Sequence, residues 1–318
     1  MRATVIANRR ARNLVTEGPL LSELRRPRDG VTLIETGSLQ DLDQAARAAR
    51  DSDVVVLAGG DGSSMAGVTA LARACGEGRE MPIVALAPGG TTGTVGRNWR
   101  GPTRGTPLRR RDDVACARQL LDAIVRGDGV VTRRPTLSVE ADGGPRRIGF
   151  IFAGGLAARF FEVYEAEGSG GNLGAAKIVA RIFAGSFVGS RLARRILEPV
   201  SVTISVDGAE VPFTRASLVA ASVVRDLGLH MHLLYRAGES LDRFHAVATP
   251  LGPARLGPQM PLVLGGRRLL GPGVDALASE LVLRFPVGEG AYVLDGELER
   301  GDVVRVTPGP VLRVLGSS

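Results

Sequence analysis

Several residue types are scarce in this sequence, and each scarcity argues against a class of protein. Only two of the 318 residues are cysteines, Cys75 and Cys116, so we expect neither a disulfide framework nor a cysteine-rich metal centre, and a reducing, cytoplasmic location is favoured. Aromatic residues make up 4%, and no RNA- or DNA-binding signature is present, so no nucleic acid partner is expected. No run of about 18 apolar residues occurs, which argues against a transmembrane helix.

The charge of the chain comes almost entirely from arginine. Lysine and arginine together number 40 against 33 acidic residues, a formal charge of +7, yet Lys177 is the single lysine. Such a bias is typical of GC-rich genomes, or it reflects attraction to anions such as nucleotide phosphates or an anionic membrane surface. Hydrophobic residues amount to 44%, and the length suits about two domains with sizeable cores.

The first 127 residues alternate short apolar runs with helical patterns. We expect strands at 4–7, 31–35, 54–58 and 83–86, and helices at 39–50, 64–74 and 112–125. Such alternation predicts right-handed βαβ units and a parallel sheet that is covered on both faces. We therefore assign residues 1–127 to a Rossmann-like parallel α/β domain.

From residue 128 onward short β-rich runs dominate. Expected strands lie at 136–140, 147–153, 200–206, 217–224, 230–234, 280–285, 291–294 and 303–306. The segment 175–197 is the exception, because its pattern is helical. Residues 128–318 are therefore expected to form an antiparallel β-sandwich domain with one helical insertion, and its tail is a candidate to return to the first domain.

Polar or glycine-rich segments follow all four strands that we expect in the first domain. They are Asn8, Thr36, Gly59-Gly60-Asp61-Gly62-Ser63 and Pro88-Gly89-Gly90-Thr91-Thr92. Open α/β sheets bind ligands at the carboxyl ends of their strands, and glycine lets backbone N–H groups approach a phosphate closely. Four such segments at one sheet edge predict a nucleotide site, although turn geometry alone explains any single one of them.

Asp61 is unusual in such a loop because a carboxylate repels phosphate. Its presence is explained if it binds Mg²⁺ or accepts a proton from an incoming hydroxyl, and both tasks belong to phosphoryl transfer. The structural alternative is an N-cap for the helix expected at 64–74, although Ser63 or Ser64 is able to fill that position.

The sequence resembles the diacylglycerol kinase-like lipid kinases, which include bacterial diacylglycerol kinases and the sphingosine and ceramide kinases and are distantly related to NAD kinases. The resemblance rests on Asn8, GGDGS at 59–63, PGGTT at 88–92, LDGE at 294–297 and the closing segment 303–315. It implies an α/β domain that binds ATP, a β-sandwich domain, and Mg²⁺-dependent phosphorylation of a lipid hydroxyl in the cleft between them.

The resemblance also implies roles for individual residues. The positions that match nucleotide-binding residues of the family are Asn8, Thr36, Gly59, Gly60, Asp61, Gly62, Ser63, Gly90 and Thr91. Glu297 matches the carboxylate that accepts the proton, and Asp61 matches a loop acid with a catalytic or Mg²⁺-linked role. Glu239 lies near the place of an Asp-Gly pair that helps to bind Mg²⁺, so it is the candidate metal ligand. Which acid is the base stays open, and without the resemblance Glu297 is best explained as a solvated charge.

Several positions depart from the family pattern. Met65 and Ala66 stand where the family has Asn-Glu, Gly93 and Thr94 stand where it has Asn-Asp, and Ala157 replaces an acid. The departures favour an unusual substrate or donor, or lost catalysis. Two alternatives to a lipid kinase therefore remain: an NAD kinase-like phosphotransferase and a non-catalytic lipid- or nucleotide-binding protein. The acceptor lipid (diacylglycerol, ceramide or a sphingoid base) and the oligomeric state are left open.

One basic segment suits a membrane. Arg191, Arg194 and Arg195 follow the apolar segment 178–190, a pattern typical either of a solvated helix face or of a helix that lies on anionic headgroups. A lipid substrate favours the second, so we expect peripheral contact with an anionic membrane surface. The arginines at 104–111 are able to act in the same way.

The histidines do not suggest a metal site. His230 and His232 alternate along an expected strand, and His245 is not spaced as a third ligand. We interpret them as residues of a strand surface.

Overall fold

The computed structural model describes residues 1–76, 78–89, 94–100, 113–167 and 172–316, and the chain divides into two compact units. Unit 1 comprises Met1–Arg134 together with Pro310–Ser318, and unit 2 comprises Pro135–Gly309. The division lies seven residues beyond the expected one at residue 127, because strand β5 (Val130–Arg134) belongs to unit 1.

Unit 1 is built on a six-stranded sheet with the order β2-β1-β3-β4-β20-β5. Its other strands are β1 (Ala3–Asn8), β2 (Val31–Thr36), β3 (Val54–Gly59), β4 (Ile83–Pro88) and β20 (Leu312–Gly316). Strands β1 to β4 pair in parallel, as the alternating pattern predicts. Every residue of β3 is buried, because the sheet is covered on both faces, and the strand is accordingly apolar along its whole length.

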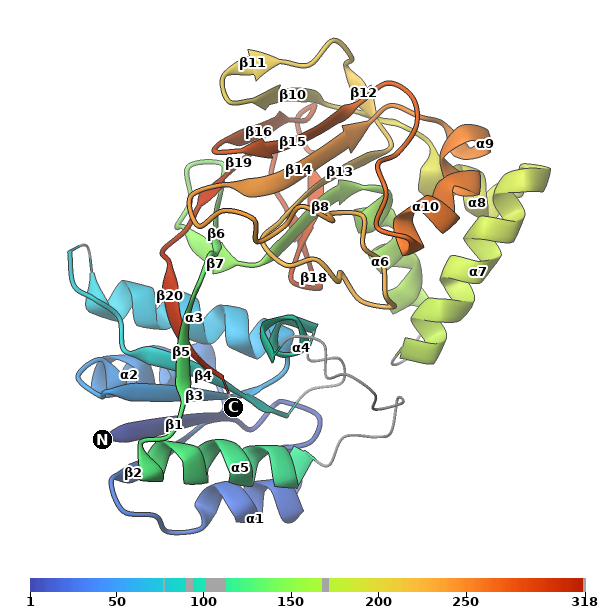
Figure 1. Cartoon of the computed structure of the whole chain (residues 1–318). Coiled ribbons are helices and arrows are strands. Elements are labelled where there is room, and N and C mark those ends of the chain that lie inside the picture. Colours follow the sequence, from blue (N-terminus) through green and yellow to red (C-terminus); the bar gives the residue numbers. More distant parts are fainter. Residues whose placement is uncertain (77, 90–93, 101–112, 168–171, 317–318) are drawn as a thin grey trace. The chain divides into compact units, whose positions relative to one another are not determined.

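Helices cover both faces of this sheet and form a three-layer α/β/α arrangement (Figure 1). Helices α1 (Pro19–Arg25) and α5 (Asp113–Arg126) share one core cluster with alternate residues of β1 and β3. Helices α2 (Leu39–Ala49) and α3 (Asp61–Cys75) pack against each other on the opposite face. The short helix α4 (Thr94–Arg100) follows β4 in the chain.

The C-terminal strand β20 completes the sheet of unit 1. It lies between β4 and β5, with Val314 opposite Val84 in a parallel pair and Leu312 opposite Arg134 in an antiparallel pair. The chain thus returns from unit 2 to unit 1 after Gly309. The edge strand β5 joins the sheet through β20.

Unit 2 contains two six-stranded antiparallel sheets and a short two-stranded ladder. The first sheet has the order β11-β10-β16-β19-β6-β7, made of β6 (Leu137–Ala141), β7 (Arg147–Gly149), β10 (Thr203–Val206), β11 (Ala209–Glu210), β16 (Leu281–Arg284) and β19 (Val303–Pro308). The second has the order β15-β14-β13-β8-β17-β18, made of β8 (Ile151–Gly155), β13 (Leu218–Ser222), β14 (Phe244–Thr249), β15 (Val274–Ala278), β17 (Ala291–Leu294) and β18 (Glu297–Arg300). The ladder pairs β9 (Val200–Ser201) with β12 (Arg215–Ala216). The expected fold class, parallel α/β followed by antiparallel β, is confirmed.

Helices pack on the second sheet and bury one of its faces. Apolar residues of α6 (Leu156–Ala166), α7 (Asn172–Val188) and α8 (Arg191–Leu197) share one core with β13 and β14. The helix expected at 175–197 is divided because Gly189 adopts φ 62° and Ser190 caps α8 by accepting a hydrogen bond from the N–H of Ala193. The short elements α9 (Pro253–Leu256), η1 (Gly257–Gln259) and α10 (Met260–Leu264) follow β14.

Three expected strands differ from the structure. The run 200–206 is divided at Val202 into β9 and β10, which belong to different sheets. The run 147–153 is interrupted at Phe150, which separates β7 from β8. Residues 230–234 form turns rather than a strand, because Leu229 and His230 adopt φ of 52° and 57°, which breaks the extended path. Among the described residues, no helix combines the length and the apolar character that crossing a bilayer requires.

Candidate functional site

The carboxyl ends of β1, β2, β3 and β4 bring the predicted loops to one edge of the unit 1 sheet. The side-chain amide of Asn8, at the end of β1, donates a hydrogen bond to the Oγ atom of Ser63 over 2.7 Å. The Oδ1 atom of Asn8 accepts from the N–H of Arg10 over 2.9 Å, which fixes the orientation of the amide. The β1 and β3 loops are therefore joined directly by side chains that the sequence assigned to one site.

Thr36, at the end of β2, stabilises this edge through hydrogen bonds to the end of β1. Its side chain is buried, its hydroxyl donates to the carbonyl oxygen of Ala7 over 3.3 Å, and its own carbonyl accepts from the N–H of Arg9 over 2.8 Å. Thr36 therefore holds the end of β1 in place, and its predicted contact with a nucleotide stays a prediction.

Close backbone approach explains the glycines of the two loops. A Cβ atom on Gly59 would lie 2.5 Å from the Cβ atom of Ser63, and one on Gly89 would lie 3.0 Å from the backbone of Gly59. The first distance is shorter than packed atoms allow, so a side chain at Gly59 would displace the loop. The second is tight, so a side chain at Gly89 would require the backbone of Gly59 to shift slightly. Gly90 and Thr91, also predicted to bind nucleotide, lie outside the described residues.

The amino terminus of α3 lies within this edge. Helix α3 has 15 residues and starts at Asp61, so Asp61, Gly62 and Ser63 form its first turn. Gly60 is the N-cap residue and provides no side-chain cap. The first N–H groups of a helix have no acceptor within it, and the positive end of the helix dipole favours an anion there. A glycine-lined loop at the start of a long helix is a suitable cradle for phosphate.

Asp61 caps a different helix from the one that the sequence suggested. Its Oδ2 atom accepts from the N–H of Thr94 over 2.8 Å, and its Oδ1 atom accepts from the N–H of Val95 over 3.1 Å. These residues begin α4, so the interpretation of Asp61 as an N-cap for the following helix is wrong. Its carboxylate instead joins the Gly59–Ser63 loop to the segment after β4, a contact that local sequence patterns do not reveal.

Charges near this edge are partly compensated. Arg9 pairs with Glu17 over 3.2 Å and with Glu35 over 3.1 Å, and Arg25 also pairs with Glu35, over 2.6 Å. Hydrogen bonding by Arg25, together with the charges of Arg25 and Arg9, holds the pKa of Glu35 below its usual value of 4.5 in spite of desolvation. Arg10 is exposed and so is better placed than Arg9 to meet an anion from solution.

One departure from the family pattern has a structural explanation. Met65 is 1% exposed and packs in the interior of unit 1, on the side of α3 that meets the sheet. A polar residue at this position would need a hydrogen-bond partner in the interior, whereas methionine is buried there without that requirement.

In unit 2, the buried acid of the LDGE motif is Asp295 rather than Glu297. Asp295 and Gly296 form the β17–β18 turn with φ of 49° and 91°. The Asp295 carboxylate accepts from the N–H of Phe150 over 3.0 Å and from that of Ile151 over 2.8 Å. The sequence indicated the turn but not this contact, because Phe150 and Ile151 lie far away along the chain.

Glu297 and Glu239 are both ion-paired near the surface. Glu297 begins β18 and pairs with Arg147 over 2.9 Å, while Glu239 lies in a turn and pairs with Arg236 over 3.1 Å. Among the described residues, the one cluster of His, Cys, Asp and Glu side chains close enough to share a metal ion does not include Glu239. The catalytic role of Glu297 and the metal-binding role of Glu239 therefore stay predictions.

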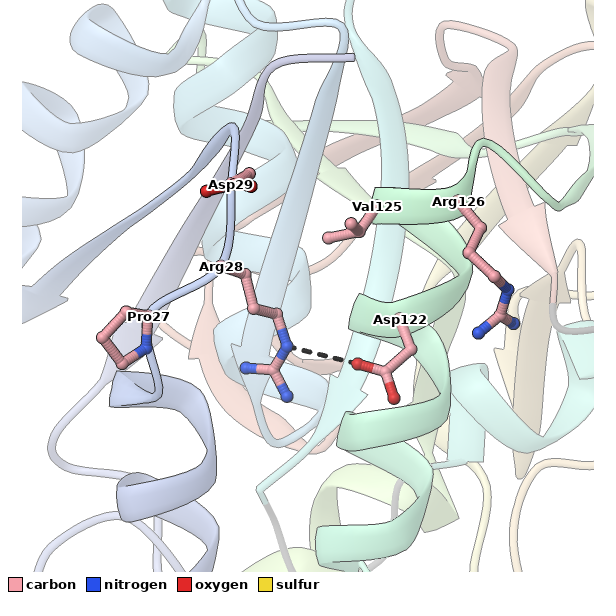
Figure 2. Close-up of a pocket in the computed structure, with 6 residues that line it drawn as sticks. All are labelled: Pro27, Arg28, Asp29, Asp122, Val125 and Arg126. Carbon is pink, nitrogen blue, oxygen red and sulfur yellow. Dashed lines mark hydrogen bonds and ion pairs between the residues drawn. The ribbon is translucent and has the colours of Figure 1, made fainter.

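A surface pocket of unit 1 lies away from this edge. Figure 2 shows it between the loop that precedes β2 and the end of α5, with Arg28 bonded to Asp122. Its volume is about 490 Å³, and the bond from Arg28 to Asp122 measures 3.3 Å. It is lined by Pro27, Arg28, Asp29, Asp122, Val125 and Arg126. Because this loop leads into β2, the pocket lies at the amino end of that strand and is not part of the candidate site.

Comparisons with known proteins agree with these motifs. Residues 2–130 match the family model of the diacylglycerol kinase catalytic domain. No curated protein matches the chain.

Solved structures share the fold of the whole chain. A diacylglycerol kinase from Bacillus anthracis str. Sterne aligns with a TM-score of 0.57 at 14% identity, covering 99% of this chain and 94% of that one. A second structure from the same organism, provisionally described as a diacylglycerol kinase, aligns with a TM-score of 0.63 at 14% identity, covering 99% of this chain and 97% of that one. An NAD kinase from Archaeoglobus fulgidus in complex with ATP gives a TM-score of 0.49 at 14% identity, covering 100% of this chain and 94% of that one.

At these identities the solved structures establish the fold alone, whereas the family model covers the loops that form the candidate site. The resemblance indicated by the motifs is confirmed: residues 2–130 of this chain match the diacylglycerol kinase catalytic domain.

Proposed function

We propose that this protein is a lipid kinase that transfers the γ-phosphate of ATP to a lipid hydroxyl with the help of Mg²⁺. The loop Gly59–Ser63 carries the proposal, because it combines a glycine with no space for a Cβ atom, the start of a long helix and the carboxylate of Asp61. A site that only binds a dinucleotide does not require that acid. The family match over residues 2–130 and the described activity of the solved relatives support the same conclusion.

The residues at this edge suit the phosphates of ATP. The N–H groups in the first turn of α3 and the Asn8 side chain bonded to Ser63 offer donors at one place. When bound, Mg²⁺ neutralises charge on the transferred phosphoryl group. Such ions usually keep several waters and take one or two protein carboxylates, so Asp61 fits as the ligand from this loop, either directly or through water.

The acceptor hydroxyl needs a base, and the two candidate acids differ in their structural duties. Asp61 accepts hydrogen bonds from the start of α4, whereas Glu297 forms an exposed ion pair. We assign the base role to Glu297 and the Mg²⁺-binding role to Asp61. Removal of a general base typically lowers the rate by about 10²–10⁴-fold, so Glu297→Gln should lower kcat on this scale and change the pH profile, while leaving ATP affinity unchanged. A variant that retains its full rate would contradict the assignment.

The decisive experiment is phosphoryl transfer with purified protein. Labelled ATP, Mg²⁺ and a panel of diacylglycerol, ceramide, a sphingoid base and NAD are incubated with the protein, and the products are separated. We expect label on one lipid. Label on NAD would instead establish the NAD kinase-like alternative, and ATP binding without transfer to any acceptor would establish a non-catalytic relative.

A glycine variant tests the phosphate cradle. In Gly59→Ala the new Cβ atom would lie 2.5 Å from that of Ser63, so we expect the Kd for ATP to rise at least tenfold. Gly252→Ala, where nothing lies within 4 Å, is the matched control and should bind ATP as the unaltered protein does. Equal affinity in both variants would contradict the proposed position of the phosphates.

We also propose that unit 2 contacts an anionic membrane through the junction of α7 and α8, from the cytoplasmic side. Phe187 and Val188, at the end of α7, are 62% and 81% exposed. Arg191, Arg194 and Arg195 follow on α8 and are exposed as well. Exposed apolar side chains next to arginines suit the boundary between acyl chains and anionic headgroups.

Vesicle sedimentation tests this contact. Each arginine near an anionic surface contributes about 1 kcal/mol, so replacing Arg191, Arg194 and Arg195 by Gln should weaken binding to phosphatidylglycerol vesicles at least tenfold. The matched control replaces Arg146, Arg243 and Arg300, three exposed arginines elsewhere in unit 2, and should change binding little. Equal losses would indicate non-specific attraction of a basic protein.

A further inference from the structure

A long connection in unit 2 brings two of the three histidines of the chain next to an aspartate. Residues 223–243 link β13 to β14 and include no helix or strand. Asp226, His230 and His232 of this connection each present one ligand atom, and these atoms lie within 4.8 Å of one another. Among the described residues this is the single group of three such side chains that meets this distance.

The backbone fixes the positions of these three residues. Leu229 and His230 both adopt left-handed φ, of 52° and 57°, and so reverse the chain between Asp226 and His232. The N–H of His232 donates to the carbonyl oxygen of Val263 over 3.0 Å, which ties this end of the turn to α10. The turn that replaced the expected strand thus faces both histidines toward the aspartate.

A backbone hydrogen bond orients the Asp226 carboxylate toward His230. Its Oδ1 atom accepts from the N–H of Gly228 over 2.8 Å, and its Oδ2 atom lies 3.7 Å from the Nδ1 atom of His230. That distance is too long for a hydrogen bond. It is close to the ~3.4 Å that separates two ligand atoms of a tetrahedral zinc ion with bonds of about 2.0–2.1 Å. His230 is 73% exposed, so rotation of its side chain is able to close the remaining gaps.

We propose that Asp226, His230 and His232 bind a divalent transition metal ion of the zinc class, with water in the remaining position. Imidazole nitrogens suit Zn²⁺, Ni²⁺ and Cu²⁺, whereas Mg²⁺ prefers oxygen ligands. The ion is therefore different from the Mg²⁺ of the proposed kinase reaction, and this inference does not depend on that reaction.

The bound ion would secure the first half of the connection. Leu233 and Leu234, in its second half, are already buried in the core that α6, α7 and α8 share with the sheet. In residues 226–232, Leu227 packs against this core but is only partly buried. A metal ion that joins Asp226 to His232 would add a constraint to this partly buried stretch.

Titration of the full-length protein with zinc tests the proposal. Protein stripped of metal with a chelator is titrated with ZnSO₄ by calorimetry and followed by thermal unfolding. We expect one ion per chain and an increase in Tm that saturates with zinc, while MgCl₂ gives no such increase. Loss of even an outer-shell partner weakens metal sites by about 10–100-fold, so Asp226→Asn, His230→Gln and His232→Gln should each weaken zinc affinity at least tenfold.

Controls separate this site from chance binding by surface histidines or cysteines. Glu289→Gln, an exposed carboxylate outside the cluster, should bind zinc unchanged. His230→Gln/His232→Gln leaves only His245, which is fully buried, and should abolish binding. X-ray absorption of the zinc-loaded protein should show nitrogen and oxygen ligands. Unchanged affinity in Asp226→Asn, sulfur ligands, or full binding by the double variant would each overturn the proposal.

Discussion

Asp61 combines a structural contact with the chemical role that we propose for its carboxylate. It accepts hydrogen bonds from the N–H groups of Thr94 and Val95, and it belongs to the loop that we propose to hold ATP. A loss of activity on mutation therefore does not by itself identify a base. Stability measurements are needed beside kinetics to separate the two duties.

The structural duty of Asp61 is measurable. Asp61→Ala should lower the free energy of unfolding by about 1–3 kcal/mol, because two backbone N–H groups lose their acceptor in a half-buried place. Urea unfolding of the full chain gives this value. Asp43→Ala removes an exposed ion pair with Arg73 and should cost less than about 1 kcal/mol. An Asp61→Ala protein as stable as this control would contradict the capping contact.

Glu23 makes the stability of unit 1 depend on pH. Its buried carboxylate accepts from Arg118 over 2.8 Å and also bonds to Arg28. Hydrogen bonding by Arg118, and then by Arg28, outweighs desolvation and holds the pKa of Glu23 below its usual value of 4.5. A carboxyl group with a lower pKa in the folded state stabilises the fold above its unfolded pKa, and this contribution is lost as the pH falls through the folded pKa.

Glu23→Gln should therefore be less stable than the unaltered protein at neutral pH, and the difference should shrink below pH 4.5. Urea unfolding of both proteins over a pH series measures it. A difference that stays constant through the acidic range would show that the carboxylate charge is not responsible. Glu80→Gln, which removes an exposed ion pair with Arg313, is the control and should show little pH dependence.

At the scale of elements, the β17–β18 hairpin depends on its turn acid. Asp295 is 8% exposed and accepts from the N–H groups of Phe150 and Ile151, where β7 ends and β8 begins. Asp295→Ala leaves these donors without that acceptor in a buried place and should lower the free energy of unfolding by about 2–3 kcal/mol. Glu297→Ala removes only an ion pair near the surface and should cost less than about 1 kcal/mol.

The two variants also separate structure from chemistry. Thermal unfolding should distinguish Asp295→Ala clearly from the unaltered protein, and Glu297→Ala hardly at all. The rate of phosphoryl transfer per folded molecule should show the opposite order: Glu297→Ala should lower it strongly, and Asp295→Ala should change it much less. A strong loss of stability in Glu297→Ala would contradict this division of roles within one motif.

Elements with a strong period or a buried apolar run could be predicted from the sequence, and others could not. Strands β1 to β4 and helices α2, α3 and α5 lie close to their expected places. Helix α6 was missed because it follows β8 directly after Gly155, which has φ 67° and gives no capping signal. Strand β14 was missed because its buried sequence, FHAVAT, does not alternate and includes His245.

The predicted strand at 230–234 failed for a different reason. Alternating His and Met residues fit a half-exposed strand by their period, but Gly228, Leu229 and His230 all adopt positive φ. Turn geometry then decided the structure, and the same turn produced the cluster of Asp226, His230 and His232. A local pattern does not report such a contact, because it depends on the direction in which the backbone reverses.

At the scale of the molecule, the C-terminal segment is required by the N-terminal unit. Strand β20 fills the position between β4 and β5, so a chain that ends at Gly309 leaves both strands with unpaired backbone groups. We expect this truncated protein to lose the cooperative unfolding of unit 1 and to become sensitive to protease. Replacing residues 317–318 alone is the control, since they lie beyond β20. Unchanged protease resistance after truncation at Gly309 would contradict this role.

The amino-acid sequence by itself determined the fold class and the place of the candidate nucleotide site. Apolar runs that alternate with helical patterns require a covered parallel sheet, and the carboxyl ends of its strands then bring Asn8 and the loop at 59–63 together. Which groups the key aspartate side chains contact was decided only by the tertiary structure. Asp61 meets α4, Asp295 meets the break between β7 and β8, and Asp226 meets two histidines across a turn. The physical reason is that a hydrogen bond acts over about 3 Å in space, while the period of a sequence reports only which face a residue occupies.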